Sequence, residues 1–372
     1  MTTANNRSLT TNIVINGISI PVISWQCHLT SYGNLCTFEV TTSIYQAKQL
    51  IPDIFTICNN NATVECDIYL SDSAAGTSGL VFSGIIDTVN GEWDDDILEI
   101  TGRDYSAVLR DKQVTLDQYV NQTVSQVVTG ICASQGITAN VQTTSQIAGI
   151  QASTFQGLDW SFSTSPKPLW KILQELAEEV DCIVFMDRLK TLHFVSPGVG
   201  GKAQTYTWRP TQTANAAVEG PSNQNPIMKL SIMQQGRRCN NFTLFLHGYN
   251  RDGKQTIYYQ KDVGSGGRII HKSRQDLNST NMEQIATSLA EEIQRKNTTL
   301  KMVVEGNLNL NVNDTMQVVE AEENDLLGLS GRNLYVSSVL HSFSMADYGS
   351  EAADGFLTHV TCNQLGAAGT TE

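Results

Sequence analysis

The side chains with the clearest capacity for chemistry lie in one stretch, residues 84–114. Two β-rich runs, residues 81–89 and 97–101, flank a turn-prone acidic segment, and this pattern predicts a hairpin. Gly102 follows it and allows a close approach or a backbone angle that a side chain would block. Arg103 and Asp104 could act as a catalytic pair, but they can also pair across the bend or bond its free backbone groups. We predict the structural role.

The acidic run Asp94, Asp95 and Asp96 is a second candidate, because carboxylates are the ligands that divalent cations prefer. Three consecutive residues of a turn do not converge on one point, however. No glycine follows at the spacing of a calcium loop. The run therefore predicts a solvated hairpin tip.

Other catalytic signatures are incomplete. Residues 198–202 have the wrong glycine spacing for a phosphate loop, and Ala203 stands where Ser or Thr would be needed. Residues 328–331 lack the final spacing of a nucleophile elbow. The histidines show no spacing that would put two imidazoles on one metal, so single satisfied histidines are expected: His28, His193, His247, His271, His341 and His359. Spacing alone does not exclude a carboxylate pair for glycoside cleavage, because any two acids can meet in a fold, but nothing in the sequence points to one.

Composition places these residues in a β-rich protein. The chain has 372 residues, enough for two or three domains, with 40% apolar and only 16% charged residues. The formal net charge is −13, and residues 1–120 hold 14 acidic against 5 basic side chains. This charge balance argues against nucleic-acid binding, which needs clustered Lys and Arg. The excess of acidic side chains either repels nearby DNA or only keeps the protein soluble.

Residues 1–11 contain no secretory pattern, and no run of about 18 apolar residues is present, so a cytosolic protein without membrane insertion is expected. The eight cysteines are scattered and most lie in apolar runs: Cys27, Cys36, Cys58, Cys66, Cys132, Cys182, Cys239 and Cys362. They are expected to be buried thiols in a reducing compartment. Cys27 and Cys36 could face each other across a hairpin, but we predict no disulfide.

The first third of the chain predicts six or seven strands in about 100 residues, the density of a small barrel or sandwich. Residues 13–20 form a hairpin around Asn16-Gly17. Residues 25–30, 35–41 and 63–70 are further strands. A short helix is expected over residues 105–109.

The middle of the chain mixes helices and strands. Apolar residues at helical spacing predict helices over residues 123–134 and 168–180, the second beginning at Pro168. A β-hairpin follows over residues 183–195, so helix and hairpin are expected to pack as one unit. The polar stretch 211–225 predicts a linker.

Strands resume at residues 228–233 and 241–246, before a glycine-rich excursion over residues 248–274. A capping box at residues 280–283 predicts a helix to about residue 296. Five strands complete the chain, among them residues 308–312, where Leu308, Leu310 and Val312 alternate with asparagines.

The fold class predicted from these elements is β-rich α+β, with two β-units of similar size and a helix/hairpin unit between them. The first β-unit is a small barrel or a sandwich, and the second is barrel-like. The predicted boundaries are residues 1–115 for the first barrel and 116–200 for the α+β domain. The second barrel combines residues 201–247 and 299–365. Residues 248–298 form a loop and helix insertion, and residues 366–372 a flexible tail.

The hairpin and its glycine corner resemble the baseplate hub proteins of contractile-tailed bacteriophages, the late-control D family, with relatives in phage-derived bacteriocins and type VI secretion spikes. The residues that carry the resemblance are Gly84, Asp87, Gly102, Arg103, Asp104, Ser106, Leu109 and Asp111. Residues 168–177 before the hairpin 185–194 are similar to the family's "W-x-x-L-x-x-L-A, strand, turn, L-x-F" element. The C-terminal order also looks like the hub pattern, although Asn313-Asp314 stands where relatives usually carry Gly-Asp.

The resemblance implies that the two β-units are tube-like antiparallel β-barrels with an inserted helix/hairpin domain. It also implies a homotrimer in which the two barrels of each chain alternate around the axis. Six similar barrels would then meet a hexameric tail tube protein, and a trimeric central spike protein would dock below. Tape-measure and wedge or baseplate proteins are further implied partners, in a virion tail baseplate made in the bacterial cytoplasm. No active site, cofactor or metal is implied. DNA would pass without specific binding, and part of the acid excess, with Asp94, Asp95 and Asp96 as candidates, is predicted to line the channel.

Two other classes remain open. A tail-associated hydrolase of cell-wall or capsule polymer would need one close acid pair. A β-rich carbohydrate-binding module would need clustered exposed aromatics, whereas the tryptophans are spread singly along the chain: Trp25, Trp93, Trp160, Trp170 and Trp208.

Overall fold

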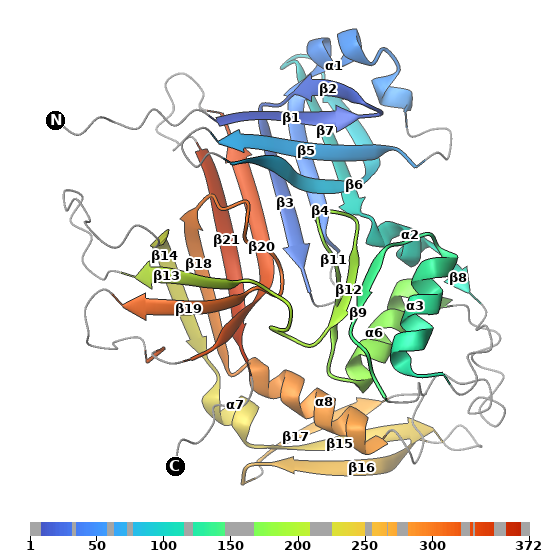
Figure 1. The fold of residues 1–372 in the computed structure, drawn as a ribbon, viewed down its shortest axis with the longest axis vertical. Coiled ribbons are helices and arrows are strands. Elements are labelled where there is room, and N and C mark those ends of the chain that lie inside the picture. Colours follow the sequence, from blue (N-terminus) through green and yellow to red (C-terminus); the bar gives the residue numbers. More distant parts are fainter. Residues whose placement is uncertain are drawn as a thin grey trace.

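A computed structural model describes residues 9–31, 35–57, 63–72, 77–114, 122–145, 167–208, 225–249, 255–265, 267–273, 282–320, 328–329, 332–345 and 355–365. The predicted linker, apart from its last residue, and the predicted C-terminal tail lie outside these residues, as do Cys58, Gly266 and the start of the capping box at Thr280. Figure 1 shows the strands gathered in two β-rich halves, with helices at the side and at the lower end.

Seven antiparallel strands form the first half. Asn16 and Gly17, at φ 50° and 80°, make the predicted two-residue turn between the first two strands. A helix, α1 (Ile44–Leu50), and a short 3₁₀ turn, η1 (Ile54–Thr56), follow the fourth strand. The pairing order is β3-β4-β7-β6-β5-β1-β2. The strands are β1 (Leu9–Ile15), β2 (Ile18–Pro21), β3 (Ser24–Thr30), β4 (Thr37–Ser43), β5 (Glu65–Asp72), β6 (Thr77–Glu92) and β7 (Ile97–Asp104).

Six strands form the second half: β13 (Ala203–Trp208), β14 (Asn225–Gln234), β18 (Thr298–Glu305), β19 (Thr315–Glu320), β20 (Leu334–Ser344) and β21 (Gly355–Gln364). Their pairings run β20-β21-β18-β14-β13-β19 and return from β19 to β20, a closed circuit. The pairs of β13 with β14 and with β19 are parallel, and the others are antiparallel. β3 pairs with β20, so both halves belong to one 13-stranded sheet. The predicted β-rich α+β class is confirmed, with a large and mostly antiparallel sheet.

The predicted strand at residues 308–312 is wrong. Residues 306–314 form turns between β18 and β19, although Leu308, Leu310 and Val312 are buried as the alternation suggested. The intervening polar residues explain the difference. The Asn309 amide donates to Asn307 Oδ1 at 2.9 Å, and the Asn311 amide donates to an Asp314 carboxylate oxygen at 2.9 Å. Such local side-chain bonds compete with a strand ladder for the same backbone groups.

The α+β unit follows the prediction closely. Thr123 and Gln126 cap α3 (Val124–Ser134) with a capping box, and the apolar stripe of α6 (Leu169–Glu179) is buried. The predicted hairpin is β11 (Ile183–Met186) with β12 (Leu192–Val195), and β9 (Ala139–Val141) joins β12 in parallel. α2 (Ser106–Asp111) connects this unit to β7. A two-stranded pair, β8 (Gln113–Val114) with β10 (Lys167–Pro168), lies beside it.

A separate three-stranded sheet lies at the lower end of the molecule in Figure 1. Its order is β16-β15-β17, with β15 (Phe242–Tyr249) between β16 (Gln255–Val263) and β17 (Arg268–Ser273). The long helix α8 (Met282–Arg295) packs on this sheet. The short helix α7 (Gly236–Asn240) comes directly before β15 in the chain. β15 therefore pairs with the predicted insertion rather than with the strands of the second half. The reason is that Phe242, Leu244 and Leu246 share a core with α8.

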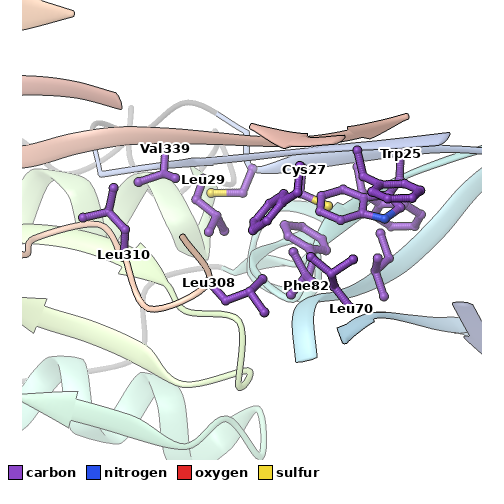
Figure 2. Packing of buried hydrophobic residues seen from close by; sticks show 14 of the residues in the cluster. Trp25, Cys27, Leu29, Leu70, Phe82, Leu308, Leu310 and Val339 are labelled. Carbon is purple, nitrogen blue, oxygen red and sulfur yellow. The ribbon is translucent and has the colours of Figure 1, made fainter. Parts of the chain in front are cut away.

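Three apolar clusters hold these units. The largest runs through both β-rich halves, and Figure 2 shows Trp25, Cys27 and Leu29 of β3 in the same cluster as Leu308 and Leu310. The second fills the α+β unit and the third lies under α8. All seven described cysteines are buried free thiols, as predicted, and Cys27 and Cys36 form no disulfide. Burial raises the pKa of both thiols.

Candidate functional site

Arg103 is the centre of the glycine corner. Its Nε and Nη2 donate to the two oxygens of Asp87 at 2.7 and 2.8 Å, and its Nη1 and Nη2 donate to Asp111 at 2.9 Å each. We call these three residues the Arg103 fork. Asp87 lies where the β6–β7 register shifts, between Ile86 and Thr88. The hydrogen bonds to Asp87 and then Asp111 raise the pKa of Arg103, and Arg103 lowers the pKa of Asp111.

Asp104 points the other way, into the protein. It is 2% exposed and accepts hydrogen bonds from the Ser106 amide, at 3.2 Å, and from the Ser106 hydroxyl. Arg110 Nε donates to Ser106 Oγ at 3.1 Å, and its guanidinium lies 4.6 Å from the centre of the Trp170 ring. Burial raises the pKa of Asp104, and Ser106 opposes that shift. These contacts hold the first turn of α2 against β7.

The two motif glycines lie where the backbone and two aromatic rings approach closely. An added Cβ at Gly84 would meet the Arg103 carbonyl oxygen at 2.4 Å. At Gly102 it would meet the Ile85 carbonyl oxygen at 2.1 Å and Phe38 at 2.5 Å. Phe38 pairs with Gly102 across β4–β7, so its ring occupies the space that a side chain would need. Neither glycine has a positive φ, and close approach is the requirement here.

The structure thus brings all eight motif residues to one joint. Leu109 lies in the apolar core of the α+β unit, and Phe38, which packs on Gly84 and Gly102, lies in the core of the β-rich halves. The cavity described next is lined by none of the eight. The corner has the geometry of a joint between β7 and α2, with every polar group of the motif bonded within the chain.

The acidic run splits into two kinds of residue. Asp96, at φ 53°, accepts from Ser43 Oγ at 2.6 Å and from the Tyr45 amide at 2.9 Å, so it caps α1. The bond from Ser43, then that from Tyr45, lowers the pKa of Asp96. Asp94 and Asp95 are exposed at the hairpin tip, as predicted. The capping role was not predicted, because Ser43 and Asp96 are far apart in sequence.

A cavity of about 230 Å³ lies between α6 and α8. Arg295 holds both oxygens of Asp181 there, with Nη1 to Oδ2 at 2.8 Å and Nη2 to Oδ1 at 2.5 Å. Burial, followed by a hydrogen bond to Asp181, raises the pKa of Glu291. A hydrolase would need two opposed carboxyl groups free to act on substrate. Asp181 is engaged by Arg295, and Glu178 and Glu292 also line the cavity.

The described residues contain no group of three or more His, Cys, Asp or Glu side chains arranged to hold a metal ion. Their helices include none with the length and apolar character needed to cross a membrane.

Comparison with solved structures matches nearly the whole chain. The tail protein from Neisseria meningitidis MC58 superposes with a TM-score of 0.64 at 13% identity, covering 96% of each chain. The 43 kDa tail protein of prophage MuSo2 from Shewanella oneidensis gives a TM-score of 0.62 at 16% identity, covering 95% of this chain and 98% of that one. The chain has the fold of phage tail proteins.

A secretion-system protein shares this tail-protein fold. The Escherichia coli c3393 protein, a component of the type VI secretion system described as similar to the T4 tail proteins gp27 and gp5, gives a TM-score of 0.52 at 13% identity. The match covers 95% of this chain and 76% of that one. No family model and no curated protein sequence matches the chain. The resemblance inferred from the sequence is confirmed for the fold.

Proposed function

We propose that this protein is a structural hub subunit of a phage-type tail, which forms a trimeric ring with pseudo-sixfold symmetry. The ring would join a hexameric tail tube protein to a trimeric central spike protein. The observation that carries the proposal is the shared fold with phage tail proteins over 95% or more of this chain. A symmetry adaptor needs two similar β-units per chain and broad interfaces, and it needs no active site.

The strand pairings support a closed unit in the second half, whereas β1–β7 form an open order in the described residues. The closed circuit of β13, β14, β18, β19, β20 and β21 is proposed as one tube-like barrel, and β1–β7 as the other. The β3–β20 pair makes the sheet continuous between them, from Ser24 opposite Ser344 to Thr30 opposite Ser338. Three chains in a ring would then present six β-units to the tube. The predicted domain boundaries are kept in this proposal, except that β15 belongs with the insertion.

The glycine corner and the Arg103 fork are proposed as a structural motif of this hub. They fix the end of β7 to α2, and so fix the α+β unit against the first β-unit. Lys190 supports the same arrangement, because its Nζ lies 2.6 Å from Glu65 of β5 and 4.6 Å from the centre of the Tyr105 ring. A rigid attachment suits a subunit whose task is to hold a ring together.

The negative charge of the first half is proposed to face the channel. Asp94, Asp95 and Asp96 are all exposed at the hairpin tip, but Asp96 is also bonded to Ser43 and to the Tyr45 amide. Asp94 and Asp95 are therefore the stronger candidates. Glu39 of β4 and Glu99 of β7 add an acid pair, and burial together with the neighbouring Glu99 raises the pKa of Glu39. Like charge on the wall would repel phosphates, so DNA would pass without specific binding.

The proposed role also implies where the chain is made and which proteins lie beside it. The chain is made in the bacterial cytoplasm and assembles into the tail baseplate, beside the tape-measure and wedge proteins and without membrane insertion. The isolated chain is proposed to self-associate weakly and to close into a ring with its neighbours. Small polar interfaces between two copies of the chain would be weak by themselves, so ring closure would require the neighbouring tube and spike proteins.

Mass measurement of the assembled particle tests the stoichiometry. Native mass spectrometry of the complex with tube and spike proteins should give three copies of this chain per particle. A density map of the same particle should place Asp94 and Asp95 on the channel wall. Six copies, or one, would overturn the hub proposal, and a neutral or basic wall would overturn the channel proposal alone.

A further inference from the structure

Two histidines meet on the outer face of the small sheet. β15 and β17 run parallel, with Phe245 beside His271 and His247 beside Ser273. His247 Nε2 lies 2.7 Å from His271 Nδ1. The two residues come from separate strands, so no local spacing motif marks them in the sequence.

Both rings are oriented by their surroundings. The His271 ring stacks on Phe245, with centroids 5.4 Å apart and an angle of 17° between the planes. The His247 and His271 centroids are 5.0 Å apart. Leu244 and Leu246 point to the opposite face, where α8 covers them, so His271 stays exposed to solvent and His247 half-buried. An ion would therefore have access to two side chains whose positions are already restricted.

The two ring nitrogens are close enough to bind one metal ion after a small rearrangement. In the hydrogen bond, one ring donates N–H and the other offers its lone pair. Bonds of about 2.0–2.1 Å at a tetrahedral angle would separate two ligating nitrogens by about 3.3 Å, so the rings need to part by about 0.6 Å and to turn until both lone pairs point at the ion. The proton of the donating nitrogen moves to the far nitrogen of the same ring.

We propose that His247 and His271 form a binding site for a late first-row divalent transition metal, with Zn²⁺ and Cu²⁺ as the ions it would take. Imidazole nitrogens favour these ions over Mg²⁺ and Ca²⁺, and Cu²⁺ is expected to bind more tightly than Zn²⁺. No third His, Cys, Asp or Glu of the described residues completes the site, so water fills the remaining positions. The bound ion cross-links β15 to β17.

Zinc titration of the full chain without an affinity tag tests the proposal. Isothermal calorimetry in chelator-treated buffer should show one saturable Zn²⁺ per chain for the native protein. His359→Ala is the matched control, because His359 is an exposed histidine on β21, remote from this sheet, and this variant should bind as the native chain does. His247→Ala and His271→Ala should both lose the saturable phase.

Two additions separate a lost ligand from a damaged sheet. His271→Gln retains a side chain able to bond His247 but removes the imidazole ligand, and it should also lose the site. Electron paramagnetic resonance with Cu²⁺ should show coupling to two imidazole nitrogens in the native chain. Absence of saturable binding by the native protein would overturn the proposal. Unchanged binding by any of the three His247 or His271 variants would overturn it as well.

Discussion

Gly102→Ala should be among the most damaging single-methyl changes in this protein. The new Cβ would lie 2.1 Å from the Ile85 carbonyl oxygen and 2.5 Å from Phe38, whereas carbon atoms in contact lie about 3.5–4.0 Å apart. Phe38 is 2% exposed and packs on Phe82 with ring centroids 5.5 Å apart, so its ring has no free space to enter. Overpacking of this kind costs about 1–3 kcal/mol, and the backbone contact places the expected loss at about 3 kcal/mol.

Gly79→Ala on β6 is the matched control for this change. No heavy atom lies within 4 Å of its added Cβ, and its φ is not positive, so the substitution should be neutral or stabilise by about 0.5–1 kcal/mol. The two Gly→Ala variants should therefore differ by about 3–4 kcal/mol in free energy of unfolding.

Urea unfolding followed by far-ultraviolet circular dichroism and tryptophan fluorescence measures that difference. Phe38→Leu in the Gly102→Ala background should recover part of the loss, because the smaller side chain vacates the space above residue 102. A Gly102→Ala protein within about 0.5 kcal/mol of the native one would refute the close-approach argument. Equal losses at residues 79 and 102 would refute it too.

Three further predictions concern polar groups. Arg103→Met should lower the free energy of unfolding by about 1–2 kcal/mol. Because the Arg103 fork is partly exposed, this loss of stability should become smaller in 1 M NaCl. The same loss with and without salt would contradict a charge effect. Burial, then Arg188, lowers the pKa of His341 from 6.5 to about 3. The unfolded chain therefore binds a proton that the native chain excludes as the pH falls through 6.5. The free energy of unfolding should decrease by about 1.4 kcal/mol between pH 7.5 and 5.5. His341→Asn should remove that part of the slope in urea titrations, and an identical slope would contradict the assignment. Asp96→Ala should speed hydrogen exchange of the Tyr45 amide, whereas Asp94→Ala should leave it unchanged; equal exchange in both variants would contradict the cap.

The local elements of this fold could be predicted from the sequence. The Asn16-Gly17 turn, the capped helix α3 and the apolar stripe of α6 formed where expected. Each depends on residues a few positions apart, whose hydrogen bonds and periodicity are fixed before any distant contact forms. The partners of Arg103 in the glycine corner were not predicted: Arg103 bonds Asp87 and Asp111 instead of Asp104, although both are close to it in sequence.

Tertiary structure decided how these elements are joined. Ser338 of β20 lies opposite Thr30 of β3, and β15 turns away from the second half because its apolar face packs under α8. The burial of Leu308, Leu310 and Val312 was predicted from their alternation. The amides of Asn309 and Asn311 donate to the side chains of Asn307 and Asp314, however, and this segment forms turns instead of a strand. Strand pairing at long range depends on which apolar faces can be buried together, and this is a property of the assembled cores. For the same reason, the meeting of His247 with His271 emerges only from the folded sheet.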